Sequence, residues 1–288
     1  MSSPDFNYAD AILPPLSFAG PPVVGVRYII ATSQRTGSTL LTDALTGTGI
    51  AGAPEEYFLK ATHGDDFLKR RFGVREDAEY IGRLIAATAT PNGVFGFKLF
   101  WGQWDGLVPK LMAAAGGSSQ GPLHEALPGL LQAALGSPRY VWLRRRDKVA
   151  QAVSLYRASR TGIWRAQAGR NDQECVADRE LVFDFDQIHA SVQRLEQADW
   201  NWDAYFRSYR LRPLMLFYEE FVTHYEMTVQ GVLKFLGLPH EDAAIPPPKL
   251  ERQADERSRE WETLYREMSA RAKKEFVLEG VQEGEIIK

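Results

Sequence analysis

The sequence predicts an α/β fold of three layers, in which helices flank a central, mainly parallel β-sheet. From residue 27 onward, short apolar runs alternate with longer amphipathic segments. This alternation is typical of parallel sheets that helices cover on both faces. Hydrophobic residues make up 44% of the 288 positions, which is enough for a sizeable core. We expect an irregular, proline-rich arm over residues 1–26 and a single domain over residues 27–288.

The first half of the expected domain consists of a strand, a helix and a second strand. Residues 26–31 form a short apolar run, which is typical of a buried strand. Residues 38–48 carry apolar side chains at helix spacing, and Gly49 marks the C-terminal end of this helix. A second apolar run over residues 93–99 predicts the next strand.

The second half continues the alternation with longer helices. A turn signal precedes an apolar strand over residues 139–143, and Asp147 is placed to cap a helix that runs to about residue 164. The remaining predicted elements are an amphipathic helix over 184–210, a strand over 213–218 and a helix over 222–236 that ends at Gly237.

Bulk composition argues against several classes of protein. The formal net charge is −3, so the strongly basic surface of a nucleic-acid-binding protein is missing. The single cysteine, Cys175, cannot form an intrachain disulfide, which fits a reducing compartment. The first residues lack the basic start of a signal peptide, and no apolar run has the roughly 18 residues of a transmembrane helix. We therefore expect a cytoplasmic protein without a transmembrane segment.

The stretch YIIATSQRTGST, residues 28–39, joins the first strand to the first helix through a loop that carries Arg35 and Gly37. This arrangement places a phosphate group on the helix N-terminus, as in a P-loop. A nucleoside-triphosphate P-loop reads G-x-x-x-x-G-K-[ST], but here Thr32 stands at its first glycine and Ser38 at its lysine. We predict a P-loop-like fold whose loop binds a phosphate-like group without the groups for ATP hydrolysis. The alternative is an ordinary tight turn.

A second basic stretch, VWLRRRDKVAQAVSLYR, places Arg145 and Arg146 at a strand end and Ser154 two helical turns later. Guanidinium and hydroxyl groups at this spacing can hold one phosphate together. The alternative is a solvated basic cluster. A third stretch, LERQADERSREW, places Arg252 in a loop before a charged helix that Asp255 or Ser258 can cap. Its alternative is a surface helix entry.

Five stretches in one order carry a resemblance that spans nearly the whole chain after the arm. They read ATSQRTGSTLL, TGIAGAPEEYF, TPNGVFGFKLFW, RRDKVAQAVSLYRA and KLERQADERSREW. With them the chain resembles the bacterial trehalose 2-sulfotransferase family, within the sulfotransferases that use 3′-phosphoadenosine 5′-phosphosulfate (PAPS) and release 3′-phosphoadenosine 5′-phosphate (PAP). Several long matches in order are more specific than any one motif.

The resemblance implies the residues that hold PAPS. The 5′-phosphosulfate would be bound by Arg35, Thr36, Gly37, Ser38 and Thr39. The 3′-phosphate would be bound by Ser154 with Arg145 or Arg146: the usual spacing in sulfotransferases favours Arg146, and the pattern of this family favours Arg145. Arg252 would lie where the family closes over the nucleotide.

The resemblance also implies the catalytic groups. Glu56 would be the general base that takes the proton of the acceptor hydroxyl, with Glu55 as its competitor. Arg35 would stabilise charge on the leaving group, and Lys98, expected at the end of its strand, would contact the sulfo group or the acceptor. Gln34, Trp101 and Trp164 are the further acceptor-site candidates, although core packing is the alternative for each tryptophan. No metal is expected.

The sequence departs from the family pattern near the expected acceptor site. Ala53 stands where the trehalose enzymes carry a glutamate, and Gly102 replaces a polar residue. The acceptor is therefore expected to be trehalose, another glycan, a glycolipid or a small alcohol. The rival functions are a P-loop nucleotide kinase or phosphotransferase and a non-catalytic nucleotide-binding protein. The resemblance also implies a possible homodimer.

Overall fold

The computed structural model describes residues 25–58, 69–116, 123–164, 180–248 and 255–284. The chain forms two compact units. The first takes the described residues within 1–146 and 198–249, and the second takes those within 147–197 and 250–288. The expected arm over residues 1–26 lies almost wholly outside the described residues, and the single domain over 27–288 stays a prediction.

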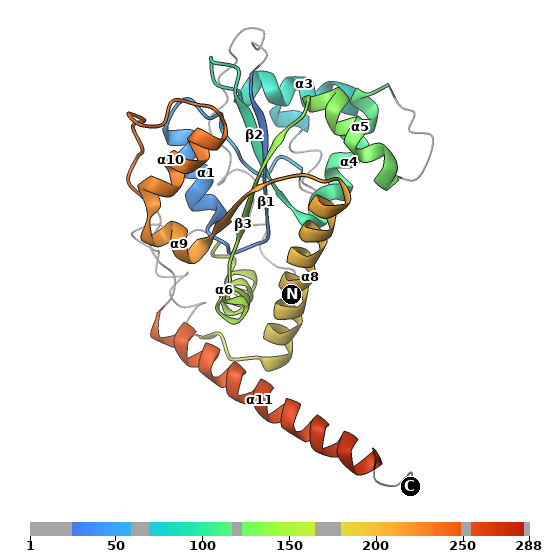
Figure 1. Cartoon of the computed structure of the whole chain (residues 1–288), viewed down its shortest axis with the longest axis vertical. Coiled ribbons are helices and arrows are strands. Elements are labelled where there is room, and N and C mark those ends of the chain that lie inside the picture. The colour runs from blue at the N-terminus through green and yellow to red at the C-terminus, as the bar shows by residue number, and fades with distance from the viewer. Residues whose placement is uncertain (1–24, 59–68, 117–122, 165–179, 249–254, 285–288) are drawn as a thin grey trace. The chain divides into compact units, whose positions relative to one another are not determined.

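The first unit is built on a parallel sheet of four strands, in the order β2-β1-β3-β4 (Figure 1). The strands are β1 (Arg27–Thr32), β2 (Phe95–Phe100), β3 (Arg139–Arg144) and β4 (Leu214–Phe217). The predicted α/β class and parallel sheet are confirmed. Because β2 and β3 lie on opposite sides of β1, the carboxyl end of β1 is a topological switch point, where ligands bind in such sheets.

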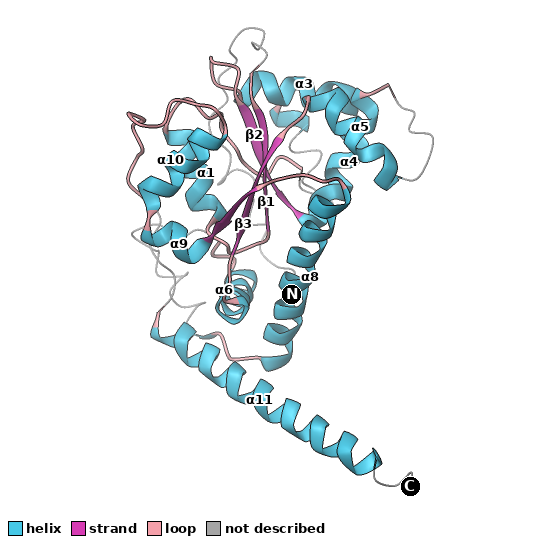
Figure 2. Cartoon of the chain, in the orientation of Figure 1, coloured by secondary structure: helices cyan, strands magenta, loops and turns pink. Residues whose placement is uncertain are grey.

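Helices cover both faces of this sheet (Figure 2). In the first unit they are α1 (Ser38–Gly47), α3 (Asp77–Thr88), α4 (Trp104–Ala114), α5 (Leu123–Leu135), α9 (Tyr218–Thr223) and α10 (Tyr225–Phe235), with a 3₁₀ turn η1 (Trp101–Gln103). The helix α8 (Phe185–Ser208) contributes its C-terminal part. The single helix expected over 222–236 was wrong in detail, because the chain breaks at His224 into α9 and α10.

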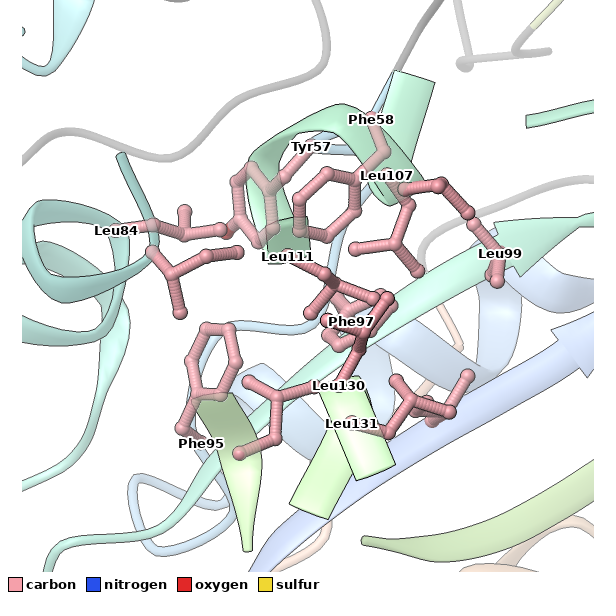
Figure 3. Packing of buried hydrophobic residues seen from close by; sticks show 14 of the residues in the cluster. Tyr57, Phe58, Leu84, Phe95, Phe97, Leu99, Leu107, Leu111, Leu130 and Leu131 are labelled. Carbon is pink, nitrogen blue, oxygen red and sulfur yellow. The ribbon is translucent and has the colours of Figure 1, made fainter. Parts of the chain in front are cut away.

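The two faces of β1 point into two separate cores. Ile29 and Ala31 pack with side chains of α3, α4, α5 and α8. Figure 3 shows part of this core, with Leu84 of α3, Leu107 of α4 and Leu130 of α5. Tyr28 and Ile30 pack on the opposite face, with side chains of α1, α9 and α10. This period of two is what a strand buried on both faces requires. The three-layer arrangement therefore follows from β1 itself.

The second unit is helical in the part of the chain that the structure describes. It contains α6 (Lys148–Thr161), the N-terminal part of α8 and α11 (Glu256–Gly284), whose apolar core includes Tyr156, Trp261 and Tyr265. Asp147 caps α6 as predicted, since its Oδ1 accepts a hydrogen bond from the Ala150 amide at 3.0 Å.

The start of α11 is fixed by an ion pair with α6. Asp255, a predicted cap, accepts from the Ser258 amide at 2.9 Å. Its two carboxylate oxygens also accept from Arg157 Nη1 and Nη2, at 2.6 and 2.8 Å. These guanidinium hydrogen bonds outweigh partial burial and hold the pKa of Asp255 well below its usual range.

Candidate active site

The loop between β1 and α1 is held in place by its own threonines. Thr32 Oγ1 donates to the Leu143 carbonyl at 2.8 Å, which ties the end of β1 to β3. Thr36 Oγ1 lies 2.7 Å from Thr32 Oγ1 and 3.1 Å from the Ser33 carbonyl oxygen. Thr32, Ser33 and Thr36 are all buried. Internal hydrogen bonds therefore help to set the shape of the loop.

Two residues of this loop have left-handed backbone conformations. Arg35 has φ 63° and Gly37 has φ 79°. Gly37 is also the N-cap of α1, so no side chain caps the amide groups of the first helical turn. Amides at a helix N-terminus and the positive end of the helix dipole favour an anion at this place.

Tyr218 packs against Gly37 from the start of α9. A Cβ atom on Gly37 would lie 2.7 Å from Tyr218 Cδ2 and 3.0 Å from Cε2, so only glycine fits between the loop and this ring. On the ring lies the Arg145 guanidinium, with its Cζ 4.7 Å from the ring centroid. Arg145 Nη1 also donates to the Arg35 carbonyl at 3.3 Å. The loop, Tyr218 and Arg145 thus form one assembly.

Arg146 lies in a different environment. Its amide donates to Glu219, and its Nη2 donates to Glu220 Oε1 at 2.6 Å. The guanidinium also lies over the Phe217 ring, at 3.7 Å from the centroid. This side chain is about half exposed. Of the two arginines that the sequence left open, the structure brings Arg145 to the loop and engages Arg146 with α9.

Beside the first turn of α1, a buried lysine lies between two carboxylates. Lys98 is 1% exposed. Its Nζ lies 3.0 Å from Glu56 Oε1 and 3.8 Å from Glu55 Oε2. It also donates to Thr39 Oγ1 at 3.5 Å, which connects the cluster to the loop. The strand β2 continues to Phe100, so Lys98 is inside the strand and not at its end as expected.

The segment that carries the two glutamates lies along the open edge of β2. The Lys98 amide donates to the Glu55 carbonyl at 3.0 Å. At the other end of the segment, Gly52 has φ 75°, and a Cβ there would lie 3.0 Å from the Val94 carbonyl oxygen. Thr42 Oγ1 of α1 donates to Glu55 Oε1 at 3.4 Å. Backbone pairing with β2 therefore sets the position of both carboxylates.

Glu56 has a second donor on its other oxygen. Gln103 Nε2 donates to Glu56 Oε2 at 3.1 Å, and Gln103 Oε1 accepts from the Phe100 amide at 2.9 Å. Each oxygen of Glu56 thus has a hydrogen-bonding partner.

Tyr57 follows the two glutamates and is buried. Its hydroxyl donates to the Ala53 carbonyl. Burial, together with the nearby Glu55 carboxylate, raises the pKa of Tyr57 well above its usual value, so the phenol stays protonated at neutral pH. Within the described ranges, no three His, Cys, Asp or Glu side chains are grouped as a metal site requires.

Comparison with known proteins identifies the family of this chain. The model of the Stf0 sulphotransferase family matches residues 27–268. The chain belongs to the Stf0 sulphotransferase family. It is a sulfotransferase, and the family expected from the five sequence stretches is confirmed.

Two curated relatives of this sulfotransferase carry the same name. Trehalose 2-sulfotransferase of Mycolicibacterium smegmatis is 33% identical over 262 residues, which cover 83% of this chain and 94% of that protein. Trehalose 2-sulfotransferase of Mycobacterium tuberculosis is 31% identical over 261 residues, with the same coverage of both chains.

The other two candidate residues of the first unit, Trp101 and Gln34, lie in different surroundings. Trp101 belongs to an aromatic cluster, with its ring 5.1 Å from Trp202 and 6.1 Å from Trp104. It is only partly buried, so packing and acceptor contact are compatible. Gln34 lies half-buried on the loop.

No helix that the structure describes has the length and apolar content of a membrane span.

Three candidates have no placement relative to the loop. Ser154 and Trp164 belong to the second unit, and the loop belongs to the first. Arg252 lies outside the described residues. Their roles stay predictions.

Sequence reasoning missed two residues of the site. Tyr218 was assigned only as the last residue of a strand, and Gln103 was not singled out, although it stands beside Gly102 in the FWGQ stretch. No local signal pointed to Tyr218. The available signal for Gln103 was a glutamine three residues after the apolar run FGFKLF, next to the glycine at 102 that was singled out.

Proposed function

We propose that this sulfotransferase transfers a sulfo group from PAPS to a hydroxyl of a carbohydrate, with Glu56 as general base. One observation carries the proposal: Lys98 connects the Glu56 carboxylate to Thr39, in the first turn of the helix that follows the loop. A base, a cation and an anion-binding helix start are thus adjacent, and sulfo transfer to a hydroxyl needs all three.

The geometry of the loop supports PAPS as the sulfo donor. The amides at the start of α1 and the Arg35 side chain would hold the phosphosulfate, since the left-handed backbone of Arg35 and Gly37 begins the helix without a capping side chain. PAPS supplies the sulfo group and a phosphate leaving group. Because the threonine hydrogen bonds already fix the loop, little ordering cost falls on binding.

The 3′-phosphate contact is assigned to Arg145 with Ser154, and Arg252 would close over the nucleotide. Arg145 is favoured over Arg146 for a physical reason. Arg146 already donates to Glu220, whereas Arg145 Nε is buried without an acceptor among the described residues. A buried donor without an acceptor costs about 1–3 kcal/mol, which an anion would offset.

Transfer of the sulfo group forms one bond to sulfur, breaks another and releases one proton. The acceptor oxygen forms a bond to sulfur as the bond between sulfur and the phosphate oxygen breaks, and the phosphate leaves with the electron pair. Glu56 takes the hydroxyl proton. Lys98 and Arg35 offset the negative charge that grows on the leaving oxygen and the sulfo group. No metal is required for this sequence of events.

The acceptor is assigned to the carbohydrate class because both curated relatives are named trehalose 2-sulfotransferases. Trp101 and Trp164 would offer flat apolar faces to sugar rings, and Gln34 a hydrogen bond. The alanine at position 53 offers no side-chain acceptor for a sugar hydroxyl. We therefore include other glycans and glycolipids beside trehalose. The kinase alternative is set aside by family membership.

Calorimetric titration tests the donor assignment. The purified protein is titrated with PAP and, separately, with ATP and magnesium. Tight binding of PAP without a response to magnesium–ATP is expected. A preference for magnesium–ATP, or no binding of PAP, would overturn the proposal. Sedimentation of the same sample tests the homodimer, which stays a prediction.

A further inference from the structure

We propose that Gln103 is a positioning residue that orients the Glu56 carboxylate for proton transfer. The inference rests on the proposed role of Glu56. It begins from the orientation of the Gln103 amide, which the surrounding hydrogen bonds determine. Gln103 Oε1 accepts from the Phe100 amide at 2.9 Å, so this atom is the oxygen. The amide nitrogen is therefore the atom that faces Glu56 Oε2, at 3.1 Å.

The consequence for Glu56 is a carboxylate with one donor on each oxygen. Lys98 approaches Oε1 and Gln103 approaches Oε2. An ionised carboxylate has about four lone-pair sites, so two remain for an acceptor hydroxyl. The two donors fix the plane of the carboxylate and therefore the directions of those lone pairs. Proton transfer requires a lone pair aimed at the hydroxyl within hydrogen-bond distance.

The chemical nature of the Gln103 side chain matters as much as its position. An amide N–H donates a hydrogen bond to the carboxylate and brings no charge of its own into this buried place. A carboxylate at position 103 would instead repel Glu56 and favour its protonated form. Gln103 is 7% exposed, so solvent screens little of this interaction.

Two variants of similar size separate the two roles of the side chain. Gln103→Glu keeps an oxygen for the Phe100 amide and changes only the group that faces Glu56. Gln103→Met removes both hydrogen bonds. Gln151→Met is the matched control, because Gln151 is a fully buried glutamine whose hydrogen bond to Lys148 lies within α6.

The experiment measures the pH profile of kcat, PAP affinity and thermal stability for each variant. The acceptor is the sugar that the wild type sulfates fastest among trehalose, maltose and glucose. For Gln103→Glu we expect the acidic limb of the kcat profile to shift to higher pH, by about one pH unit or more. For Gln103→Met we expect kcat to fall about 10-fold to 100-fold with the Kd of PAP nearly unchanged. The control should leave the profile in place.

A merely structural role would give a different result. Both Gln103 variants would then lower the melting temperature and leave the acidic limb of kcat where it is in the wild type. That outcome would overturn the positioning role. Glu56→Gln, measured alongside, keeps the two failures apart: if its kcat stays near that of the wild type, the assignment of the base itself is wrong.

Discussion

Replacing Gly37 by alanine tests whether the loop between β1 and α1 binds PAP in the conformation seen here. Gly37 has φ 79°, a region that costs a residue with a Cβ about 1–2 kcal/mol. The new Cβ would also lie 2.7 Å from Tyr218 Cδ2, whereas carbon atoms in contact are ordinarily about 3.5–4.0 Å apart. Either the loop or the ring must therefore move.

The expected loss is about 2 kcal/mol or more, because the conformational cost and the overlap both act on the binding conformation. If the whole loss appears in binding, the Kd of PAP rises about 30-fold. Calorimetry with PAP measures the change, and thermal unfolding of the same samples shows how much of the loss is global.

Two glycine controls separate the causes. Gly49, just beyond the other end of α1, has φ 69° but open space around a Cβ, so Gly49→Ala bears the conformational cost alone. Gly102→Ala meets open space without a left-handed backbone. Both variants should bind PAP like the wild type. If Gly37→Ala also binds PAP within about threefold of the wild type, the assigned conformation of the loop is not the binding one.

Further outcomes concern single charged groups. Arg145→Ala should weaken PAP binding about 10-fold to 100-fold, whereas Arg146→Ala should change it little because its guanidinium donates to Glu220; calorimetry that ranks the two variants the other way round would favour Arg146. Asp255→Asn should lower stability at pH 7 by about 1 kcal/mol, since it removes the ion pair with Arg157. Because the pKa of Asp255 is lowered in the folded state, this stabilisation exists above its unfolded pKa of about 4 and is lost as pH falls further. Denaturant titrations should show the difference shrinking below about pH 4, and a difference independent of pH would contradict the ion-pair account.

Most of the elements predicted from the sequence have a clear hydrophobic period. All four strands and the helices α1, α6 and α8 were expected within a few residues of their observed ends. The helices α3, α4 and α5 were not predicted. Pro109 in α4 and Pro128 in α5 ordinarily signal a break. Helix α3 has no proline, and its apolar spacing was overlooked. The break between α9 and α10 has no such signal, since His224 is compatible with a helix.

The site was predictable where its residues are contiguous and unpredictable where the fold joins distant ones. The loop of residues 33–39 was visible in its own spacing, whereas Lys98 was expected at the end of its strand and is buried inside it. The contact of Lys98 with both Glu55 and Glu56 depends on how the segment after α1 pairs with β2. The choice of Arg145 over Arg146 depends on Tyr218, which begins α9 directly after the edge strand β4 and packs against the loop. Both depend on sheet order, which spacing along the chain does not specify.

The most direct test of the account compares Glu56→Gln with Glu55→Gln, because both glutamates are buried and both form an ion pair with Lys98. Transfer of labelled sulfo group from PAPS is measured for each, with the sugar that the wild type sulfates fastest, next to the Kd of PAP. Glu56→Gln should lower turnover about 100-fold or more with PAP binding retained, and Glu55→Gln should cost less than about tenfold. Turnover of Glu56→Gln within tenfold of the wild type, or a larger loss for Glu55→Gln, would contradict Glu56 as the general base.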